Sequence, residues 1–448
     1  MTVQLAGKKV VVVGLGASGV AAARLCIERD ARVIGTDSKP LEELSPAARA
    51  GDFEIFAGGH SGVDFDKVDV IVVSPGIPPL PAIATAEQAG VEVIGELELA
   101  WRLLRVPVLC VGGTNGKSTA TVLVAELLQA EGLSVFCGGN LGTPLCAAVG
   151  ESFDWVVAEA SSFQLERAPT FRPKVSVLLN ITEDHLDRYP DFEAYARAKG
   201  NAFVNQTSQD VAVIPADDAR CVAQAKRGQA RQVRFGSGGD YAVERGAVVE
   251  SATGERFDLS SARLFGAHNM SNAAAAIAAV RSQGINAESV ARGLSRFEPL
   301  PHRMDVVGSV GKIRFYDDSK ATNVGAAVTA LEGLPEPRVV LIAGGRDKLG
   351  SYAPLADALQ RKGRAVVLIG ESADRMAAAM AGRVPVLRAD SMSQAVRLAF
   401  ETATDGDAVL LSPACSSFDM FRSYADRGDR FAEAVHELGD VVDVKGAP

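Results

Sequence analysis

Residues 106–127, VPVLCVGGTNGKSTATVLVAEL, are the stretch that determines the predicted fold. An apolar run typical of a buried strand leads into a glycine-rich turn, and the turn leads into a helical pattern of apolar residues. Backbone N–H groups of such a turn can surround phosphate oxygens, and Lys117 can reach the terminal phosphates of a nucleotide. A hydroxyl from Ser118 or Thr119 can bind Mg²⁺. The stretch therefore predicts a phosphate-binding turn made of Gly113, Thr114, Asn115, Gly116 and the three residues that follow.

The turn departs from the standard phosphate-binding pattern G-x-x-x-x-G-K-[ST]. Residue 111 is valine where the first glycine should be, so that the loop is one residue shorter. The alternative is an ordinary turn that carries a surface lysine. The order of strand, glycines and helix favours the phosphate site.

Outside this stretch, short β-branched runs alternate with helical patterns along most of the chain. Examples are KKVVVVG, VDVIVVSPG, DWVVAEA and PRVVLIAGG. Continuous apolar strands separated by helices predict an α/β fold with mainly parallel sheets covered on both faces. A chain of 448 residues is too long for one hydrophobic core.

We therefore expect three domains. Residues 1–95 form an N-terminal Rossmann-like domain, residues 96–299 form a central ATPase-like domain, and residues 300–448 form a C-terminal Rossmann-like domain. The second boundary rests on two prolines near residues 298–302. From about residue 217 to 263 the polar composition predicts antiparallel hairpins or an insertion rather than a further strand and helix unit.

The composition and net charge argue against a nucleic-acid-binding protein. The chain is 47% hydrophobic and 23% charged, with a formal net charge of −9, so it offers no basic field for nucleic acid. Six cysteines are scattered without a CxxC pair or zinc-binding spacing, which is typical of reduced core residues. The sequence has no secretion signal pattern and no uncharged run of membrane-span length, so we expect a cytoplasmic protein with no membrane insertion.

A second glycine-rich turn lies near the N-terminus, in VVVVGLGASGVAAARL. Gly14, Gly16 and Gly19 have the spacing of a dinucleotide-binding turn, and Asp37 follows the next strand, where a ribose-binding acid is expected. This pattern alone favours NAD(P). The glycines require only a tight turn and a close approach to a diphosphate, so another nucleotide diphosphate remains open.

Three residues after central strands are candidates for metal or acid–base chemistry. Glu159 ends a hydrophobic strand, where a Mg²⁺ ligand is expected, although a helix-capping or surface glutamate is the alternative. His185 follows another strand end. Lys199 shares a predicted helix face with Phe192, Ala196 and Phe203. Either Lys199 extends its ammonium to water, or it is a desolvated functional amine.

Further candidates lie from residue 268 onward. His268, Asn269 and Asn272 open a helix, where the two amides can hold a nucleotide or cap the helix. Loops after later strands carry clustered basic, acidic and hydroxyl groups, which suit a carboxylate substrate and a transferring phosphoryl group. These residues are Arg303, Asp318, Lys320, Thr322, Lys348, Ser417 and Tyr424.

Together these stretches resemble the Mur ligase family. The resemblance covers essentially the whole chain, with SPGIP, GTNGKST, GGNLGTP, EASSFQLE, NITEDHLDRY, AKGNAF, HNMSNAAAA, PHRMD, DDSKATN and LSPACSSFDMF in this order. Folylpolyglutamate synthetases share the central turn and the C-terminal domain but lack the leading domain. Within the family, SSFQLE and SPACSSFD favour a ligase that adds D-glutamate.

The resemblance implies substrates and cofactors. These are UDP-N-acetylmuramoyl-L-alanine, D-glutamate, ATP, two Mg²⁺ ions and a CO₂-derived carbamate on Lys199. It also implies four sets of expected contacts. The UDP substrate contacts Gly14, Leu15, Gly16, Ala17, Ser18, Gly19, Asp37, Ser74, Pro75, Gly76, Asn140 and His185. ATP contacts residues 113–119, Asn269, Asn272, Arg303, Asp318 and Lys320, and Mg²⁺ is held by Ser118, Glu159, His185 and Lys199. D-glutamate contacts Thr322, Lys348, Ser417 and Tyr424, where the family often has phenylalanine at the last position.

The implied reaction is an ATP-dependent ligation through an acyl phosphate, in peptidoglycan precursor synthesis, with Lys117, His185 and Lys199 as catalytic residues. We expect a monomer. The amine proton can pass to His185 or to a nearby carboxylate, and the sequence does not choose between them. Three alternatives remain: a sister ligase for another amino acid, an NAD-dependent oxidoreductase, and a nucleotide-gated binding module.

Overall fold

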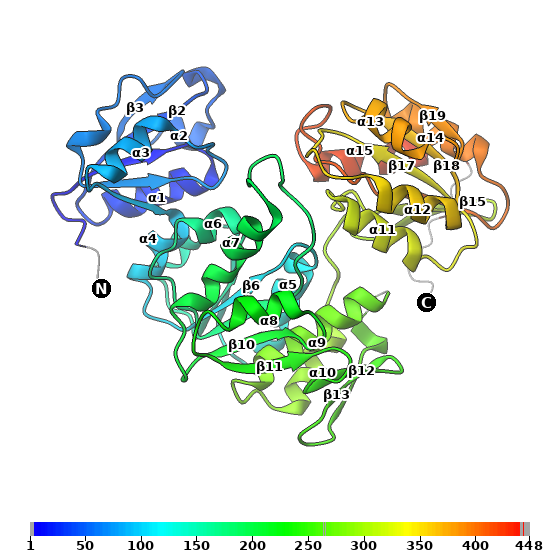
Figure 1. Cartoon of the computed structure of the whole chain (residues 1–448), viewed down its shortest axis with the longest axis horizontal. Coiled ribbons are helices and arrows are strands. Elements are labelled where there is room, and N and C mark those ends of the chain that lie inside the picture. The colour runs from blue at the N-terminus through cyan, green and yellow to red at the C-terminus, as the bar shows by residue number, and fades with distance from the viewer. Residues whose placement is uncertain (1–3, 263, 265, 440–441, 443–448) are drawn as a thin grey trace. The chain divides into compact units, whose positions relative to one another are not determined.

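The computed structural model describes residues 4–262, 264, 266–439 and 442, and within them three mainly parallel sheets, each associated with helices (Figure 1). The α/β prediction is therefore confirmed. Contacts divide the chain into two compact units. Unit 1 contains residues 1–181, 193–262 and 270–297, and unit 2 contains residues 182–192, 263–269 and 298–448.

The first sheet has five parallel strands in the order β3-β2-β1-β4-β5. Its strands are continuous apolar runs, as expected for a sheet covered on both faces. The carboxyl ends of β1, β2 and β4 lie at one edge, because these strands are parallel neighbours. The elements are β1 (Lys9–Val13), α1 (Ala17–Ile27), β2 (Arg32–Asp37), α2 (Pro46–Arg49), β3 (Glu54–Ala57), β4 (Val70–Val73), α3 (Pro81–Gln88), β5 (Glu92–Gly95) and α4 (Glu96–Leu103).

The second sheet has nine strands in the order β14-β13-β12-β11-β10-β9-β6-β8-β7. Strand β6 pairs with β8 on one side and β9 on the other, so the turn that follows it lies between the carboxyl ends of these two strands. The strands are β6 (Val108–Gly112), β7 (Val135–Gly139), β8 (Trp155–Glu159), β9 (Val175–Leu178), β10 (Val211–Pro215), β11 (Arg231–Phe235), β12 (Tyr241–Glu244), β13 (Ala247–Glu250) and β14 (Arg256–Asp258). The helices are α5 (Lys117–Ala130), η3 (Leu145–Ala148), α6 (Ser162–Glu166), α7 (Phe192–Val204), α8 (Ala219–Ala225), α9 (Ala267–Arg281) and α10 (Ala287–Arg296).

The prediction for residues 217–263 was correct only in its second half. Strands β12, β13 and β14 form the expected antiparallel hairpins. The first half instead holds one more strand and helix unit, because α8 leads into β11, which pairs parallel to β10. Its polar residues are the reason that it was not recognised, since β11 carries Arg231 and Arg234, which are both exposed, and Gln232.

The third sheet lies in unit 2, with the order β15-β16-β20-β17-β18-β19 and one antiparallel pair, β15 with β16. Its strands are β15 (Asp305–Val310), β16 (Ile313–Asp317), β17 (Val339–Gly344), β18 (Gly363–Ile369), β19 (Val386–Arg388) and β20 (Ala408–Leu411). Its helices are α11 (Val324–Gly333), α12 (Ala353–Lys362), α13 (Ala373–Met380), α14 (Met392–Thr402) and α15 (Tyr424–His436). Two hydrophobic clusters fill this part of the chain.

One hydrophobic core joins the first two sheets within unit 1. It includes Val10 and Val12 of β1 together with Val108 and Cys110 of β6. A domain boundary near residue 95 therefore stays a prediction. No helix in the described part of the chain is both long and apolar enough to cross a membrane.

Candidate functional site

The turn between β6 and α5 has the geometry of a phosphate-binding turn. Gly113 and Gly116 have φ angles of 142° and 84°, which only glycine adopts without strain. The side chain of Asn180 holds the turn from β9, since it accepts a hydrogen bond from the Asn115 N–H at 2.9 Å and donates to the Asn115 carbonyl at 3.0 Å. The backbone of the turn is thereby fixed at the N-terminus of a 14-residue helix, where an anion is favoured.

Lys117 lies in the first turn of α5 with its ammonium beside the loop. Its Nζ donates to the carbonyls of Gly113 at 3.1 Å and Thr114 at 2.9 Å. Ser118 and Thr119 are buried, and Oγ1 of Thr119 has no hydrogen-bond partner among the described residues. A buried hydroxyl without a partner costs free energy, so the loop has a polar group able to bind a further ligand.

Lys199 is buried in α7, with 3% of its surface exposed. The side chain does not extend to water, because Nζ donates to the Gly113 carbonyl at 2.6 Å. The same Nζ lies 4.5 Å from the ring centroid of Tyr195, whose hydroxyl contacts Oγ1 of Thr114 at 3.1 Å. One turn of α7 therefore places a cation and a phenol directly against the phosphate-binding turn.

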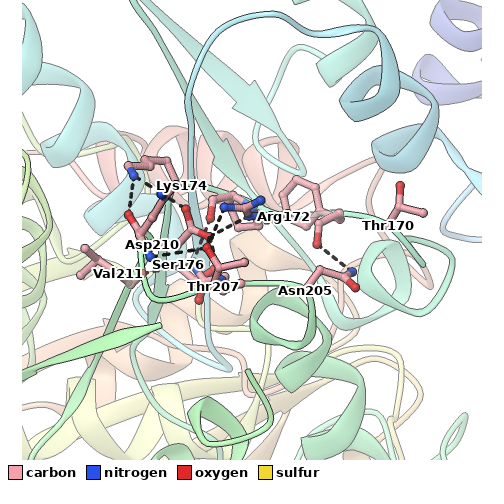
Figure 2. Close-up of polar contacts among 12 residues, drawn as sticks. Thr170, Arg172, Lys174, Ser176, Asn205, Thr207, Asp210 and Val211 are labelled. Carbon is pink, nitrogen blue, oxygen red and sulfur yellow. Dashed lines mark hydrogen bonds and ion pairs between the residues drawn. The ribbon is translucent and has the colours of Figure 1, made fainter. Parts of the chain in front are cut away.

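Figure 2 shows the polar contacts that anchor the far end of α7. Arg172 donates from Nε to Oδ2 of Asp210 and from Nη2 to Oγ1 of Thr207, both at 2.7 Å. Asn205 donates to the carbonyls of Pro169 and Phe171. These bonds tie the segment after α7 to the segment before β9, so they fix the helix that carries Lys199.

Glu159 at the end of β8 is a candidate Mg²⁺ ligand. Its side chain is 2% exposed, and Oε1 accepts a hydrogen bond from Nδ2 of Asn140 at 2.6 Å. Oε2 is buried and has no hydrogen-bond partner among the described residues. A buried carboxylate oxygen without a donor fits a cation, since Mg²⁺ binds carboxylate, hydroxyl and phosphate oxygens and keeps several waters. No cluster of three or more His, Cys, Asp or Glu side chains suited to a metal was found within the described ranges.

The first glycine turn is held by Asp37. Its Oδ2 accepts from the Leu15 N–H at 2.7 Å and its Oδ1 from the Lys39 N–H at 2.9 Å. Ser74, at the end of β4, donates from Oγ to the Gly14 carbonyl at 2.7 Å. A β-carbon at Gly19 would lie 1.8 Å from that carbonyl, so α1 and the turn approach closely. Gly16 caps the helix, Ala17 and Ser18 form its first turn, and Pro75 and Gly76 follow Ser74.

Two backbone features surround Arg303 in unit 2. His302 and Met304 have φ angles of 60° and 54°, so both flanking residues are left-handed. Nε of Arg303 is buried without a hydrogen-bond partner in the described part of the chain. Burial raises the pKa of Asp318 to about 7, and the Arg303 charge opposes this rise. Ser412 donates to Asp318 at 3.1 Å.

Lys320 and Tyr424 are brought together. Nζ of Lys320 lies 3.1 Å from the Tyr424 hydroxyl oxygen and 4.5 Å from the ring centroid. Arg427, in the same helix as Tyr424, is fully buried and donates to Oγ and the carbonyl of Ser319 and to the carbonyl of Cys415. Burial lowers the pKa of Arg427 to about 10. Ser417 is buried, and Thr322 lies in the loop after β16 with its N–H bonded to the Lys320 carbonyl.

Lys348 is paired with a carboxylate in unit 2. Its Nζ lies 3.1 Å from Oδ1 of Asp184, whose Oδ2 is 3.4 Å from Nδ2 of Asn323. His185 follows Asp184 with a φ angle of 56°, and its N–H donates to Oδ1 of Asp184 at 2.9 Å. His185 therefore belongs to unit 2, while Ser118, Glu159 and Lys199 lie in unit 1.

The two amides of α9 are both buried. Asn269 belongs to unit 2 and Asn272 to unit 1. Asn272 lies against the phosphate turn, since a β-carbon at Gly116 would be 2.3 Å from its Oδ1.

Sequence reasoning missed four residues that hold this arrangement: Asn180, Asp184, Tyr195 and Arg427. Asn180 and Asp184 stand within NITEDHLDRY, which marked the region but not their roles. Tyr195 lies one residue before Ala196 on the helix predicted to carry Lys199. Arg427 gave no signal, because a buried arginine that bonds only backbone and hydroxyl groups is identified by its tertiary contacts alone.

Three family models match the chain in order. The Mur ligase MurD-like N-terminal domain matches residues 8–95, the Mur ligase middle domain matches residues 111–280, and the Mur ligase glutamate ligase domain matches residues 302–415. Among curated relatives, the UDP-N-acetylmuramoylalanine--D-glutamate ligase of Syntrophotalea carbinolica is 45% identical, over 97% of this chain and 99% of its own length. The ligase of the same name from Desulfosudis oleivorans is 44% identical, over 97% of this chain and 98% of its own length.

Solved structures share the fold at lower identity. The UDP-N-acetylmuramate-alanine ligase of Thermotoga maritima superposes with a TM-score of 0.62 and 21% identity, over 96% of this chain and all of that one. The MurF ligase of the same organism, in complex with ADP, gives a TM-score of 0.61 and 18% identity, over 98% of this chain and all of that one. The fold is therefore that of these ligases. Full-length identity of 45% and three consecutive family matches place the chain in the Mur ligase family.

Proposed function

We propose that this chain joins D-glutamate to UDP-N-acetylmuramoyl-L-alanine in peptidoglycan precursor synthesis, with cleavage of ATP to ADP and phosphate. The observation that carries the proposal is the 45% identity over 97% of the chain to a relative named for this ligation. The geometry supports an ATP-dependent step, since Lys117 and Lys199 both direct their ammonium groups to the same glycine-rich turn. We place the reaction in the cytoplasm, where ATP is available, and expect a monomer to carry it out.

The chemistry requires an activated carboxyl group, because a carboxylate is a poor electrophile. ATP supplies the phosphoryl group that converts the terminal carboxylate of the UDP substrate into an acyl phosphate. The amine of D-glutamate attacks that carbonyl, and phosphate leaves from the tetrahedral intermediate. Lys117 would stabilise the charge on the transferring phosphoryl group, in the way that lysines of phosphate-binding turns do.

Magnesium fits the protein groups near the turn. We propose that Oε2 of Glu159 and the hydroxyl of Ser118 hold Mg²⁺, because the first is a buried carboxylate oxygen with no other partner among the described residues and the second opens α5. We also propose that two Mg²⁺ ions bind and that His185 is a further ligand. When bound, Mg²⁺ neutralises phosphoryl charge.

Lys199 is proposed to carry a carbamate formed with CO₂. Its amine is buried beside the phosphate turn, where an ammonium would repel a metal ion. A carbamate reverses the charge of this side chain and supplies oxygen atoms for a cation. The N–H of the carbamate can still donate to the Gly113 carbonyl, which would keep the modified side chain in place.

The remaining proposed contacts form three sets, one for each substrate. Asn269, Asn272, Arg303, Asp318 and Lys320 are proposed to hold the nucleotide of ATP. Thr322, Lys348, Ser417 and Tyr424 are proposed to receive D-glutamate. The glycine turn at residues 14–19, Asp37, residues 74–76, Asn140 and His185 are proposed to hold the UDP substrate. Release of Lys348 from Asp184 is then part of D-glutamate binding, since one carboxylate replaces another.

One coupled assay tests the proposal. Phosphate release from ATP is measured with each substrate alone and with both together, across D-glutamate, L-alanine, a diamino acid and D-alanyl-D-alanine. Release that requires both UDP-N-acetylmuramoyl-L-alanine and D-glutamate is expected. A preference for another amino acid would indicate a sister ligase, and release with no amino acid would indicate a nucleotide-gated binding module. Tight NADH binding without UDP binding would indicate an oxidoreductase.

A further inference from the structure

His60 lies in the loop that follows the edge strand of the first sheet. It follows β3, which pairs with β2, and β2 pairs with β1. In sheets of this type the diphosphate lies at the turn after the first strand and the ribose near the acid that ends the second. The nucleobase then lies beyond β2, toward the end of β3. His60 is three residues past the last residue of β3, Ala57.

A hydrogen-bond chain fixes the protonation of the His60 ring. Oγ1 of Thr36 is fully buried and donates its one hydrogen to the Gly59 carbonyl at 3.1 Å. The same oxygen lies 2.9 Å from Nδ1 of His60. A carbonyl can only accept, so both contacts are hydrogen bonds at once only when the hydroxyl donates to Gly59 and Nδ1 donates to the hydroxyl. The neutral ring therefore carries its proton on Nδ1, and Nε2 is left as an acceptor.

The backbone beside the ring leaves room for a planar group. Gly58 and Gly59 have φ angles of 76° and 140°, and a β-carbon at either position would meet nothing within 4 Å. Their backbone is held by two bonds, from the Gly58 N–H to the Lys39 carbonyl and from the Gly59 N–H to the Asp37 carbonyl. Both oxygens of the Asp37 carboxylate accept backbone N–H groups, so this acid is held in place beside the turn.

We propose that Nε2 of His60 accepts a hydrogen bond from N3–H of the uracil of the substrate, and that His60 thereby selects the base. This inference rests on the proposed UDP substrate. Uracil presents an acceptor, a donor and an acceptor along one edge, namely O2, N3–H and O4, so its single donor requires an acceptor on the protein. A ring locked with its proton on Nδ1 supplies that acceptor, and Thr36 is the positioning residue that locks it.

The test compares UDP with N3-methyl-UDP, which lacks the donor. Binding of each to the full chain is measured by calorimetry for wild type, His60→Ala, Thr36→Val and the control His436→Ala, which lies in unit 2. Wild type and the control are expected to prefer UDP by about tenfold, the size of one hydrogen bond. His60→Ala should bind UDP about tenfold more weakly, with unchanged affinity for N3-methyl-UDP. The affinity of Thr36→Val for UDP should lie between those of wild type and His60→Ala. Thermal unfolding checks that both variants fold.

A second readout reports on the ring itself. The chain has five histidines, so long-range ¹H–¹⁵N spectra can be assigned with the His60→Ala variant. The Nε2 signal of His60 should be that of an unprotonated nitrogen, and it should move on addition of UDP but not of N3-methyl-UDP. A proton on Nε2 in the free protein, or an unchanged preference for UDP in His60→Ala, would overturn the inference alone. Failure of wild type to bind UDP at all would overturn the proposed function, and this inference with it.

Discussion

Gly116 and Asn272 are in such close contact that a β-carbon at residue 116 would lie 2.3 Å from the side-chain oxygen Oδ1 of Asn272. Since φ at Gly116 is 84°, a side chain there is also strained by its own backbone. The phosphate turn and α9 thus share one tightly filled contact in unit 1. This contact gives the first prediction.

Gly116→Ala should displace the turn and lower kcat/KM for ATP by about 100-fold, as expected when a reacting group moves by about 1 Å. The matched control is Gly132→Ala, at the other end of α5, where φ is 94° and a β-carbon meets nothing within 4 Å. The control should lose about 1 kcal/mol of stability through backbone strain and keep its activity. Steady-state phosphate release and thermal unfolding of both variants separate the two effects. Equal kinetic loss in both would contradict the role of the Asn272 contact.

Glu159→Gln should raise the Mg²⁺ concentration for half-maximal phosphate release by at least about tenfold, because it removes a charge from a buried cation ligand. The amide keeps an oxygen for the hydrogen bond from Asn140, so the fold should be unaffected. Glu151→Gln, at an exposed position, is the control and should show no shift. An unchanged Mg²⁺ requirement in Glu159→Gln would remove this residue from the proposed metal site.

Lys199→Arg and Lys199→Ala should both lose ligase activity by at least about 100-fold. Arginine can still donate to the Gly113 carbonyl, but it keeps a positive charge and forms no carbamate. Short carboxylic acids should partly restore Lys199→Ala by filling the vacated anion position. Wild-type protein freed of CO₂ at mildly acid pH should lose activity and recover it with bicarbonate. Normal ligation by Lys199→Arg would show that a permanent cation suffices there.

Glu96 predicts a pH effect on stability. Its carboxyl is fully buried at the start of α4, Oε1 accepts from the Cys146 N–H at 2.6 Å, and Oε2 has no partner among the described residues. Burial raises its pKa from 4.5 to about 7. The folded protein therefore holds this proton more tightly than the unfolded chain does. The stability from Glu96 is complete below pH 4.5 and is lost as pH rises through about 7.

Glu96→Gln removes this titration. Between pH 5 and pH 8 the free energy of unfolding of wild type should fall relative to that of the variant, by at most about 3 kcal/mol. The exposed Glu42→Gln variant should follow wild type at every pH. Parallel curves for wild type and Glu96→Gln would mean that Glu96 is ionised in the folded protein.

The strand and helix units were predictable because their signals are local. Apolar runs identified β1, β6, β8 and β17, and helical spacing was enough to place Lys199 among apolar residues. The unit formed by α8 and β11 was not recognised, since Arg231, Gln232 and Arg234 make this strand resemble part of a polar insertion.

The contacts that complete the candidate site were less predictable. The bond from Lys348 to Asp184 joins residues 164 positions apart, and the bonds from Arg427 to Ser319 span 108 positions. Which partner a charged side chain finds across such distances depends on how sheets and loops pack. The sequence shows which charged residues are present, but only the folded structure shows which of them are partners.

The left-handed residues on both sides of Arg303 matter for anyone who tries to make this protein more heat resistant. His302 and Met304 each hold a conformation that costs a residue with a β-carbon about 1 kcal/mol or more, and glycine would remove that cost. A stability screen would therefore select glycine at 304. The same change would make the backbone next to Arg303 more flexible. The gain in melting temperature would therefore come with a less precisely positioned Arg303 guanidinium.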